Sequence, residues 1–60
     1  MQKIQSIARI AGGTLKPHTK TEWVINVASN PRALAIVINK LEKADCYIVA
    51  TRSNRVYFTI

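Results

Sequence analysis

Apolar and polar residues follow two different periods along this chain. Over residues 2–11 the apolar side chains have the helical spacing i, i+3, i+4, i+7, and they are Ile4, Ile7, Ala8 and Ala11. Gly12 and Gly13 follow directly, and glycine readily adopts the left-handed backbone that ends many helices. The pattern therefore predicts a helix over 2–11, with a strand as the alternative because the segment is rich in isoleucine.

A hairpin is predicted after this helix. Residues 14–16 can begin a strand, and the polar run 17–20 is typical of a turn. Within 22–27 two sets of residues alternate as in a strand, an apolar set of Trp23, Ile25 and Val27 and an opposite set of Glu22, Val24 and Asn26. The second strand of this hairpin therefore has one apolar side.

The second half of the chain repeats this order. Asn30 suits the N-cap of a helix and Pro31 its first position, where the missing N–H has no cost. A helix is therefore predicted over 31–44, and its buried stripe is Leu34, Val37, Ile38 and Leu41. A strand, a turn and a second strand are predicted over 46–51, 52–54 and 55–60. The inward residues of the last strand are Val56, Phe58 and Ile60.

The predicted order is αββαββ, a structural repeat in which Leu15 corresponds to Ile48 and the strand around Trp23 to the strand around Tyr57. Two αββ units form an antiparallel sheet with both helices on one face and the other face bare. We therefore predict one small α+β domain over 1–60, or the order ββαββ if the first segment is a strand. The predicted core is Trp23, Ile25, Leu34, Val37, Leu41 and Phe58.

The length of the chain limits how much surface it can bury. A domain of sixty residues hides only ~60% of the surface that its unfolded chain exposes. Gln2 begins the first helix with no capping residue before it, and Ile60 ends the chain inside a predicted strand. We therefore expect either a complete, minimal protein that associates with itself or a segment of a longer protein.

Composition and charge narrow the class of protein. Hydrophobic residues are 48% of the chain and charged residues 20%, which is typical of a globular protein. No apolar run approaches the ~20 residues of a membrane-spanning helix, so no membrane partner is predicted. Nine Lys and Arg residues against three Asp and Glu residues give a net charge of +6. Such an excess is typical of proteins that bind a polyanion, most often nucleic acid.

Few side chains are available for catalysis. The carboxylates are Glu22, Glu42 and Asp45, the only imidazole is His18 and the only thiol is Cys46. Nothing in the spacing pairs Cys46 with His18, and two soft ligands are too few for a metal site. We therefore predict no enzymatic activity, no metal and no cofactor. A single cysteine also favours an intracellular location, in the cytoplasm, the nucleoid or the interior of an organelle.

Side chains that can bind nucleic acid gather near the two predicted turns and on the bare face. They are Lys16, His18, Lys20, Arg52, Asn54, Arg55 and Tyr57. The cationic members can pair with phosphates, whereas Asn54 and Tyr57 can meet bases. The helix residues Lys3, Arg9, Lys40 and Lys43 are predicted only to face solvent. The sequence therefore predicts a nucleic-acid-binding module, with DNA favoured over RNA.

The same bare face allows a second interpretation. Val24 and Tyr57 also suit an interface with another protein, including a second copy in a homodimer. A ligand-binding domain of the ACT type is a third interpretation, since it too combines two helices with a four-stranded sheet. Its βαββαβ order disagrees with this chain.

Residues 4–15 resemble a recurrent segment of LAGLIDADG homing endonucleases, in which a helix ends at a Gly-Gly pair and leads into a hairpin. Residues 22–27 resemble the second strand of that hairpin, and residues 33–39 resemble the next helix of the family. The resemblance covers about residues 4–41 and rests on short apolar patterns. It implies DNA as the partner.

The signature helix of that family is degenerate in this chain. Its nearest match is residues 38–46, where the agreeing residues are Leu41, Ala44 and Asp45. The small residues that let two such helices pack closely are replaced by Asn39, Lys40 and Cys46. Asp45 falls at the family's metal-binding acid position, but we predict that it only ends the helix. The resemblance therefore implies DNA binding without cleavage.

Overall fold

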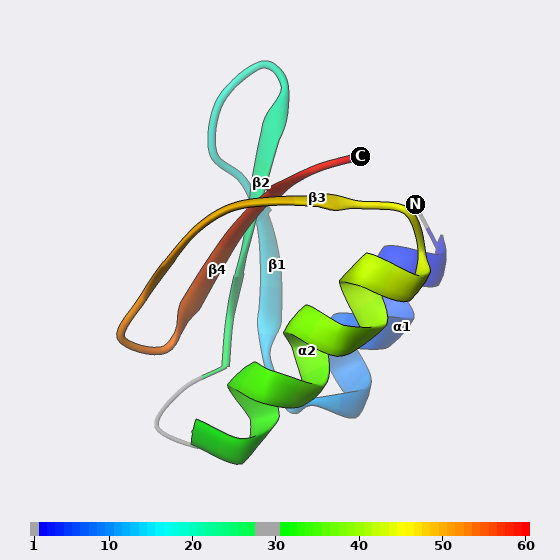
Figure 1. Cartoon of the computed structure of the whole chain (residues 1–60), viewed down its shortest axis with the longest axis vertical. Helices are drawn as coiled ribbons and strands as arrows, with labels where there is room; N and C mark the ends of the chain where they lie inside the picture. Colours follow the sequence, from blue (N-terminus) through cyan, green and yellow to red (C-terminus); the bar gives the residue numbers. More distant parts are fainter. Residues whose placement is uncertain (1, 28–30) are drawn as a thin grey trace.

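The computed structural model of the chain describes residues 2–27 and 31–60, which form helices and strands in the order αββαββ (Figure 1). The first unit consists of α1 (Gln2–Ile10), β1 (Thr14–Pro17) and β2 (Glu22–Asn26). The second unit consists of α2 (Pro31–Lys43), β3 (Tyr47–Arg52) and β4 (Arg55–Thr59). The predicted α+β class is confirmed, and residues 2–10 are helical rather than extended. The predicted cap Asn30 lies outside the described residues.

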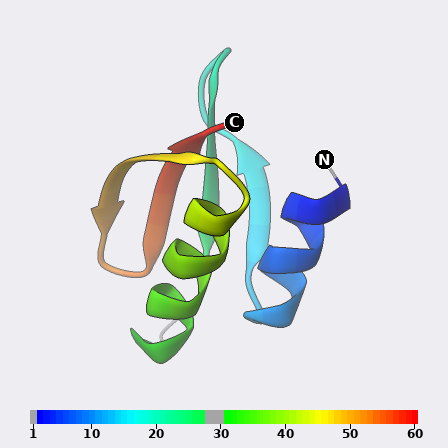
Figure 2. The same ribbon diagram turned by 45° about the vertical axis from the view of Figure 1, so that its right-hand side comes forward.

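The four strands form one antiparallel sheet in the order β1-β2-β4-β3. The inner strands β2 and β4 come from different units, and β1 and β3 are the edges. Both helices lie on the same side of the sheet (Figure 2), so the other face is left without helices. None of the helices in the described part of the chain is long and apolar enough to span a membrane.

The two units are related by an offset of about 33 residues. Thr14 and Tyr47 begin the edge strands, and Glu22 and Arg55 begin the inner strands. Val24 and its equivalent Tyr57 are also direct partners in the β2–β4 ladder. Two residues that face each other in an antiparallel ladder are related by a local two-fold axis between them. Because Val24 and Tyr57 are also equivalent positions of the two units, this axis relates the units and is an approximate two-fold axis of the whole sheet.

The two helices end in the same way. Gly12 (φ 72°) and its equivalent Asp45 (φ 63°) both have left-handed backbone conformations. The next N–H then bonds back into the helix, from Gly13 to the carbonyl of Ala8 (2.8 Å) and from Cys46 to that of Leu41 (2.9 Å). This is the Schellman arrangement, which satisfies carbonyls that a helix end leaves open. Each helix therefore turns directly into an edge strand.

The core lies between the helices and the sheet and draws on both units. Its buried members are Ile4, Ile7, Ala8, Ile25, Val27, Ala33, Val37, Leu41, Cys46, Val56 and Phe58. Four of the six predicted core residues are fully buried, whereas Trp23 and Leu34 are partly buried and pack against the cluster. The predicted inward position of Ile60 is wrong, since that side chain is 68% exposed. Strand β4 and its ladders end at Thr59, so the next residue has no cross-strand partner among the described residues.

Candidate nucleic-acid interface

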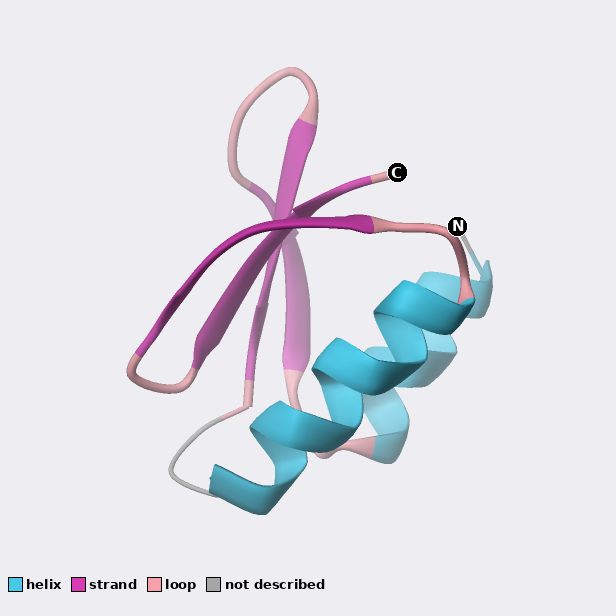
Figure 3. Cartoon of the chain, viewed as in Figure 1, coloured by secondary structure: helices cyan, strands magenta, loops and turns pink. Residues whose placement is uncertain are grey.

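The face of the sheet without helices is built from residues that alternate with the core residues along each strand. In β2 and β4 the side chains of Ile25, Val56 and Phe58 are buried, so those of Val24 and Tyr57 project to the other side. The separation of the two layers can be followed in Figure 3, where the helices lie to one side of the strands. We call this uncovered side the open face.

Two cross-strand rows organise the open face. The central row, across all four strands, is Lys16, Val24, Tyr57 and Ala50. The arginine row, nearer the β3–β4 turn, is Thr14, Asn26, Arg55 and Arg52. A β-bulge at Val49 shifts the register of β3, so that Ala50 rather than Val49 stands opposite Tyr57.

The open face contains two hollows that share a pair of rings. One, of about 320 Å³, is lined by Thr14, Lys16, His18, Val24, Asn26, Arg55 and Tyr57. The other, of about 350 Å³, is lined by His18, Glu22, Val49, Ala50, Arg52 and Tyr57. The rings of His18 and Tyr57 meet edge to face with their centroids 4.7 Å apart. This ring pair therefore contributes to both hollows and presents aromatic surface at the centre of the face.

The electrostatics of the open face are dominated by cations. Arg52 and Arg55 are direct cross-strand partners, and like charges in this position destabilise a sheet. Lys16 lines the same hollow as Arg55, and Glu22 is the one carboxylate among the residues that line the two hollows. The arrangement suits a ligand with several negative charges, because each bound anion would offset the repulsion between neighbouring cations.

The structure brings together five of the seven candidate binding residues. Lys16, His18, Arg52, Arg55 and Tyr57 all line the open face. The remaining two lie in the turns, which are at opposite ends of the sheet (Figure 1).

The β1–β2 turn holds Lys20 at an exposed tip. The side-chain oxygen of Thr19 accepts a hydrogen bond from the N–H of Glu22 (3.0 Å) and fixes this turn. In the β3–β4 turn the carbonyl of Asn54 accepts the N–H of Val27 (2.8 Å). Asn54 therefore holds the turn against the end of β2 through its backbone, a role for which the sequence pattern contains no signal.

Sequence reasoning missed three residues of the open face. Thr14 follows from alternation, because its neighbour Leu15 packs against the core. Val49 follows from alternation after Ile48, whereas Ala50 stands opposite Tyr57 only because of the bulge in β3, and the sequence pattern contains no signal for that bulge. Their small or apolar side chains leave the basic residues around them accessible.

The remaining candidates for chemistry lie away from this face. Cys46 is a free thiol buried in the core. Burial raises the pKa of this thiol, Asp45 raises it further and Lys3 lowers it. Across residues 2–27 and 31–60, no three His, Cys, Asp or Glu side chains come close enough to hold a metal ion together.

No protein-family model, curated protein or solved structure matches this chain. Its class is therefore defined by its own fold and surface: a small α+β protein with helices on one face of a four-stranded sheet and cations on the other.

Proposed function

We propose that this chain is a nucleic-acid-binding module that docks its open face on duplex DNA and has no catalytic activity of its own. The observation that carries the proposal is the cross-strand pair Arg52–Arg55 beside Lys16 on a face that no helix covers. Folding alone gains nothing from two arginines placed opposite each other. Phosphate groups would neutralise them and form charge-assisted hydrogen bonds with both.

The size and shape of the open face suit a DNA groove. The longest dimension of the chain is 27 Å, which corresponds to about eight base pairs at ~3.4 Å each. The major groove of B-DNA admits two paired β-strands, and in this proposal the inner pair β2 and β4 lies over the groove while the edge strands β1 and β3 lie toward the phosphates. In this pose the cations meet phosphates while His18, Tyr57 and Asn26 face the base edges.

The resemblance to LAGLIDADG homing endonucleases is part of this proposal and favours DNA over RNA. Under it, the chain binds DNA and does not cleave it. Asp45, at the family's metal-binding position, here has the left-handed backbone that ends α2, and it lies beside β3 rather than on the open face.

A second copy or another protein on the open face is the alternative. Two copies packed face to face would oppose two surfaces that each carry Lys16, Arg52 and Arg55 against the one carboxylate Glu22. Charge therefore favours nucleic acid over self-association on this surface.

Salt dependence of binding to a fluorescent DNA duplex tests the proposal. Each phosphate contact releases about one counterion, so log K falls as log salt rises. Replacing Lys16, Arg52 and Arg55 by Ala should make this fall shallower, by about 1 in the slope for each residue. The matched control replaces Lys3, Arg9 and Lys43, which removes the same charge from the helix side. Adding Lys20→Ala to the triple open-face variant tests whether the exposed β1–β2 turn also contacts phosphate.

The result expected is a large loss of affinity for the open-face variant and a small loss for the control. Equal losses would show diffuse attraction and contradict the proposal, as would a folded open-face variant that binds like the parent. Single-stranded DNA and an RNA duplex, titrated in parallel, rank the three nucleic acids. Light scattering of parent and variant asks whether the same arginines instead join two copies.

A further inference from the structure

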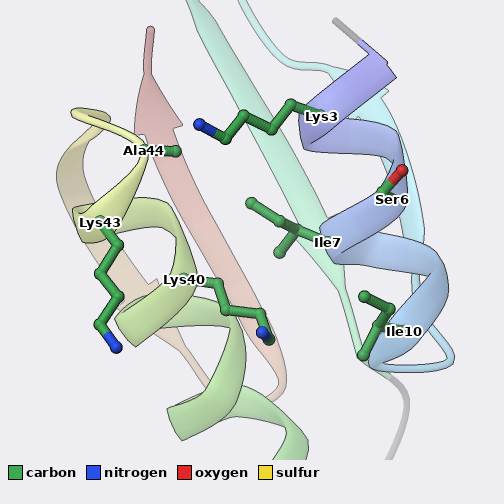
Figure 4. A pocket seen from close by; sticks show the side chains of 7 residues that line it. All are labelled: Lys3, Ser6, Ile7, Ile10, Lys40, Lys43 and Ala44. Carbon is green, nitrogen blue, oxygen red and sulfur yellow. The ribbon is translucent and has the colours of Figure 1, made fainter.

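A second surface lies on the opposite side of the molecule, between the two helices. A groove of about 330 Å³ is lined by Lys3, Ser6, Ile7, Ile10, Lys40, Lys43 and Ala44. Figure 4 shows Lys3 reaching from α1 toward Ala44, and Lys40 reaching from α2 toward α1. We call this surface the lysine groove, and it is separated from the open face by the whole core.

The lysine groove is apolar at its base and along one end. Ile7 is buried and forms part of its floor, whereas Ile10 is 68% exposed at its lower end. Ile36 is 46% exposed and lies one helical turn before Lys40, on the same side of α2. Ile10 in the groove and Ile36, one helical turn from the groove residue Lys40, are large apolar side chains that the fold itself leaves exposed.

All the charge that lines the groove is positive. Three lysines line it, and no Asp or Glu does, although α2 carries Glu42 and Asp45 follows its last turn. The side chains of Lys3 and Lys40 come from different helices, so they flank the apolar floor from both sides. A partner that fits this groove must therefore combine apolar residues at its centre with negative charge at its margins.

We propose that the lysine groove binds an acidic amphipathic helix of a partner protein. A helix fits because its apolar side chains at i, i+3, i+4 and i+7 form a ridge that can lie between α1 and α2. Acidic residues on either side of that ridge then meet the lysines. Helix α1 is nine residues long, so the groove is about 13 Å in length and accommodates about two turns of the partner.

The chemistry of the groove disfavours other occupants. A second copy would present the same lysines and be repelled. A nucleic acid would place phosphates against Ile10 and Ile36, which gain nothing from a charged surface. A small anionic ligand would find only long, flexible lysines at the rim, without the fixed polar groups that orient such ligands.

A designed peptide tests this proposal, which does not depend on DNA binding. The probe is a fluorescent peptide of about 18 residues, long enough to be helical, with leucines at i, i+3, i+4 and i+7 and glutamates beside them. Fluorescence anisotropy gives the affinity for the full chain. Methyl NMR shifts of Ile10 and Ile36, with Ile48 as the distant reference, report where the peptide binds.

The decisive variant is Lys3→Glu with Lys40→Glu, which should weaken binding of the acidic peptide about tenfold. A peptide with lysines in place of the glutamates should bind this variant better than it binds the parent. The matched control is Arg9→Glu with Lys16→Glu, the same change in net charge outside the groove. It should alter the affinity less than about twofold at moderate salt.

Several results would overturn the proposal. Equal loss in the groove variant and the control would show attraction to net charge alone. If an acidic peptide with glutamines in place of the leucines bound equally well, apolar contacts would contribute nothing to the affinity, which contradicts the proposal. The proposal also fails if the peptide shifts the open face rather than Ile10 and Ile36, or if anionic lipid vesicles bind through Lys3 and Lys40 while the peptide does not.

Discussion

The two αββ units agree in their interior and differ on their exposed face. Inside, residues related by the offset are all apolar, and such pairs are Leu15 with Ile48, Trp23 with Val56 and Ile25 with Phe58. On the open face the same relation pairs Glu22 with Arg55 and Lys16 with Val49. The repeat therefore preserves what the core requires and does not preserve the charges outside it.

This difference gives the open face a charge gradient. Arg52 and Arg55 lie at the β3–β4 turn, whereas Glu22 lies at the opposite end, beside the β1–β2 turn. The phosphate backbones of a duplex look alike from either end, so this charge gradient does not choose an orientation along the DNA. It concentrates phosphate contacts at the β3–β4 end of the face and disfavours them beside Glu22.

The edge strands β1 and β3 also differ, although each contains a feature that hinders pairing with another chain. An unpaired edge can pair with another chain, and proline or a bulge prevents this. Strand β1 ends at Pro17, which has no N–H to donate, whereas β3 contains the bulge at Val49. The two units thus protect equivalent edges by different local means.

The largest effect is expected inside the core, where the two units are alike. Phe58 has no exposed surface, so Phe58→Ala should lower the free energy of unfolding by about 3–5 kcal/mol, close to the whole stability of a small domain. Its ladder partner Trp23 is only partly buried, so Trp23→Ala should cost less. Urea titration measures both, with Phe58→Leu as the milder variant that remains folded. A larger loss at Trp23 would contradict the observed core.

The helix ends provide a second comparison between the units. A Cβ on Gly13 would lie 2.5 Å from the carbonyl oxygen of Asn26, so Gly13→Ala should destabilise the protein by about 1–3 kcal/mol. Asp45→Gly should stabilise it by up to about 1 kcal/mol, because glycine adopts the left-handed conformation without strain. Thermal unfolding measures both changes. If both substitutions destabilised the protein, Asp45 would have a further role in the native state.

Charge on the open face is tested by the equivalent residues Arg55 and Glu22. Arg55→Ala should weaken DNA binding and lower the salt slope by about 1, since one phosphate contact is lost. Glu22→Gln should strengthen binding, because it removes the carboxylate from a face that meets phosphates. Anisotropy titrations at several salt concentrations give both values. Weaker binding by the Gln variant would contradict the proposed docking of the open face on phosphates.

The smallest effect is expected from Cys46, the equivalent of Gly13. Burial raises the pKa of its thiol above the ordinary 9.0, so the unfolded chain loses this proton first as the pH rises. The thiol's contribution to stability is therefore complete below pH 9.0 and decreases above it. Urea titrations at about pH 8 and about pH 10 should show a slightly steeper fall for the parent than for Cys46→Ala. Parallel curves would show that the thiol titrates alike in both states.

Periodicity predicted the helices and strands because burial on one side imposes it directly. The α+β fold, the four fully buried core residues and the outward side of β4 all follow from that pattern. Features that depend on the register and length of paired strands were missed. The bulge at Val49 follows from the β3–β4 register, and Ile60 is exposed because no strand extends beside it.

The candidate surfaces were predicted less completely than the fold. Lys20 and Asn54 were grouped with the other candidate binding residues because they are close to them in sequence. The two turns, however, lie at opposite ends of the sheet. Lys3, Lys40 and Lys43 were predicted only to face solvent, because a single helix gives no sign of the groove that it forms with another. A sequence pattern does not show which residues of different helices and strands become neighbours in space.

The pairing of β2 with β4 also governs how the chain must assemble. Each unit can close its own hairpin locally, but the inner strand of either hairpin then has a free side until the other unit arrives. Joining them closes a loop that contains all of α2 and β3, and the entropy lost in that closure slows folding. The rate-limiting event should therefore be the meeting of two partly formed halves. A chain cut between the units should regain the fold only when both pieces are mixed, at a rate that rises with their concentration.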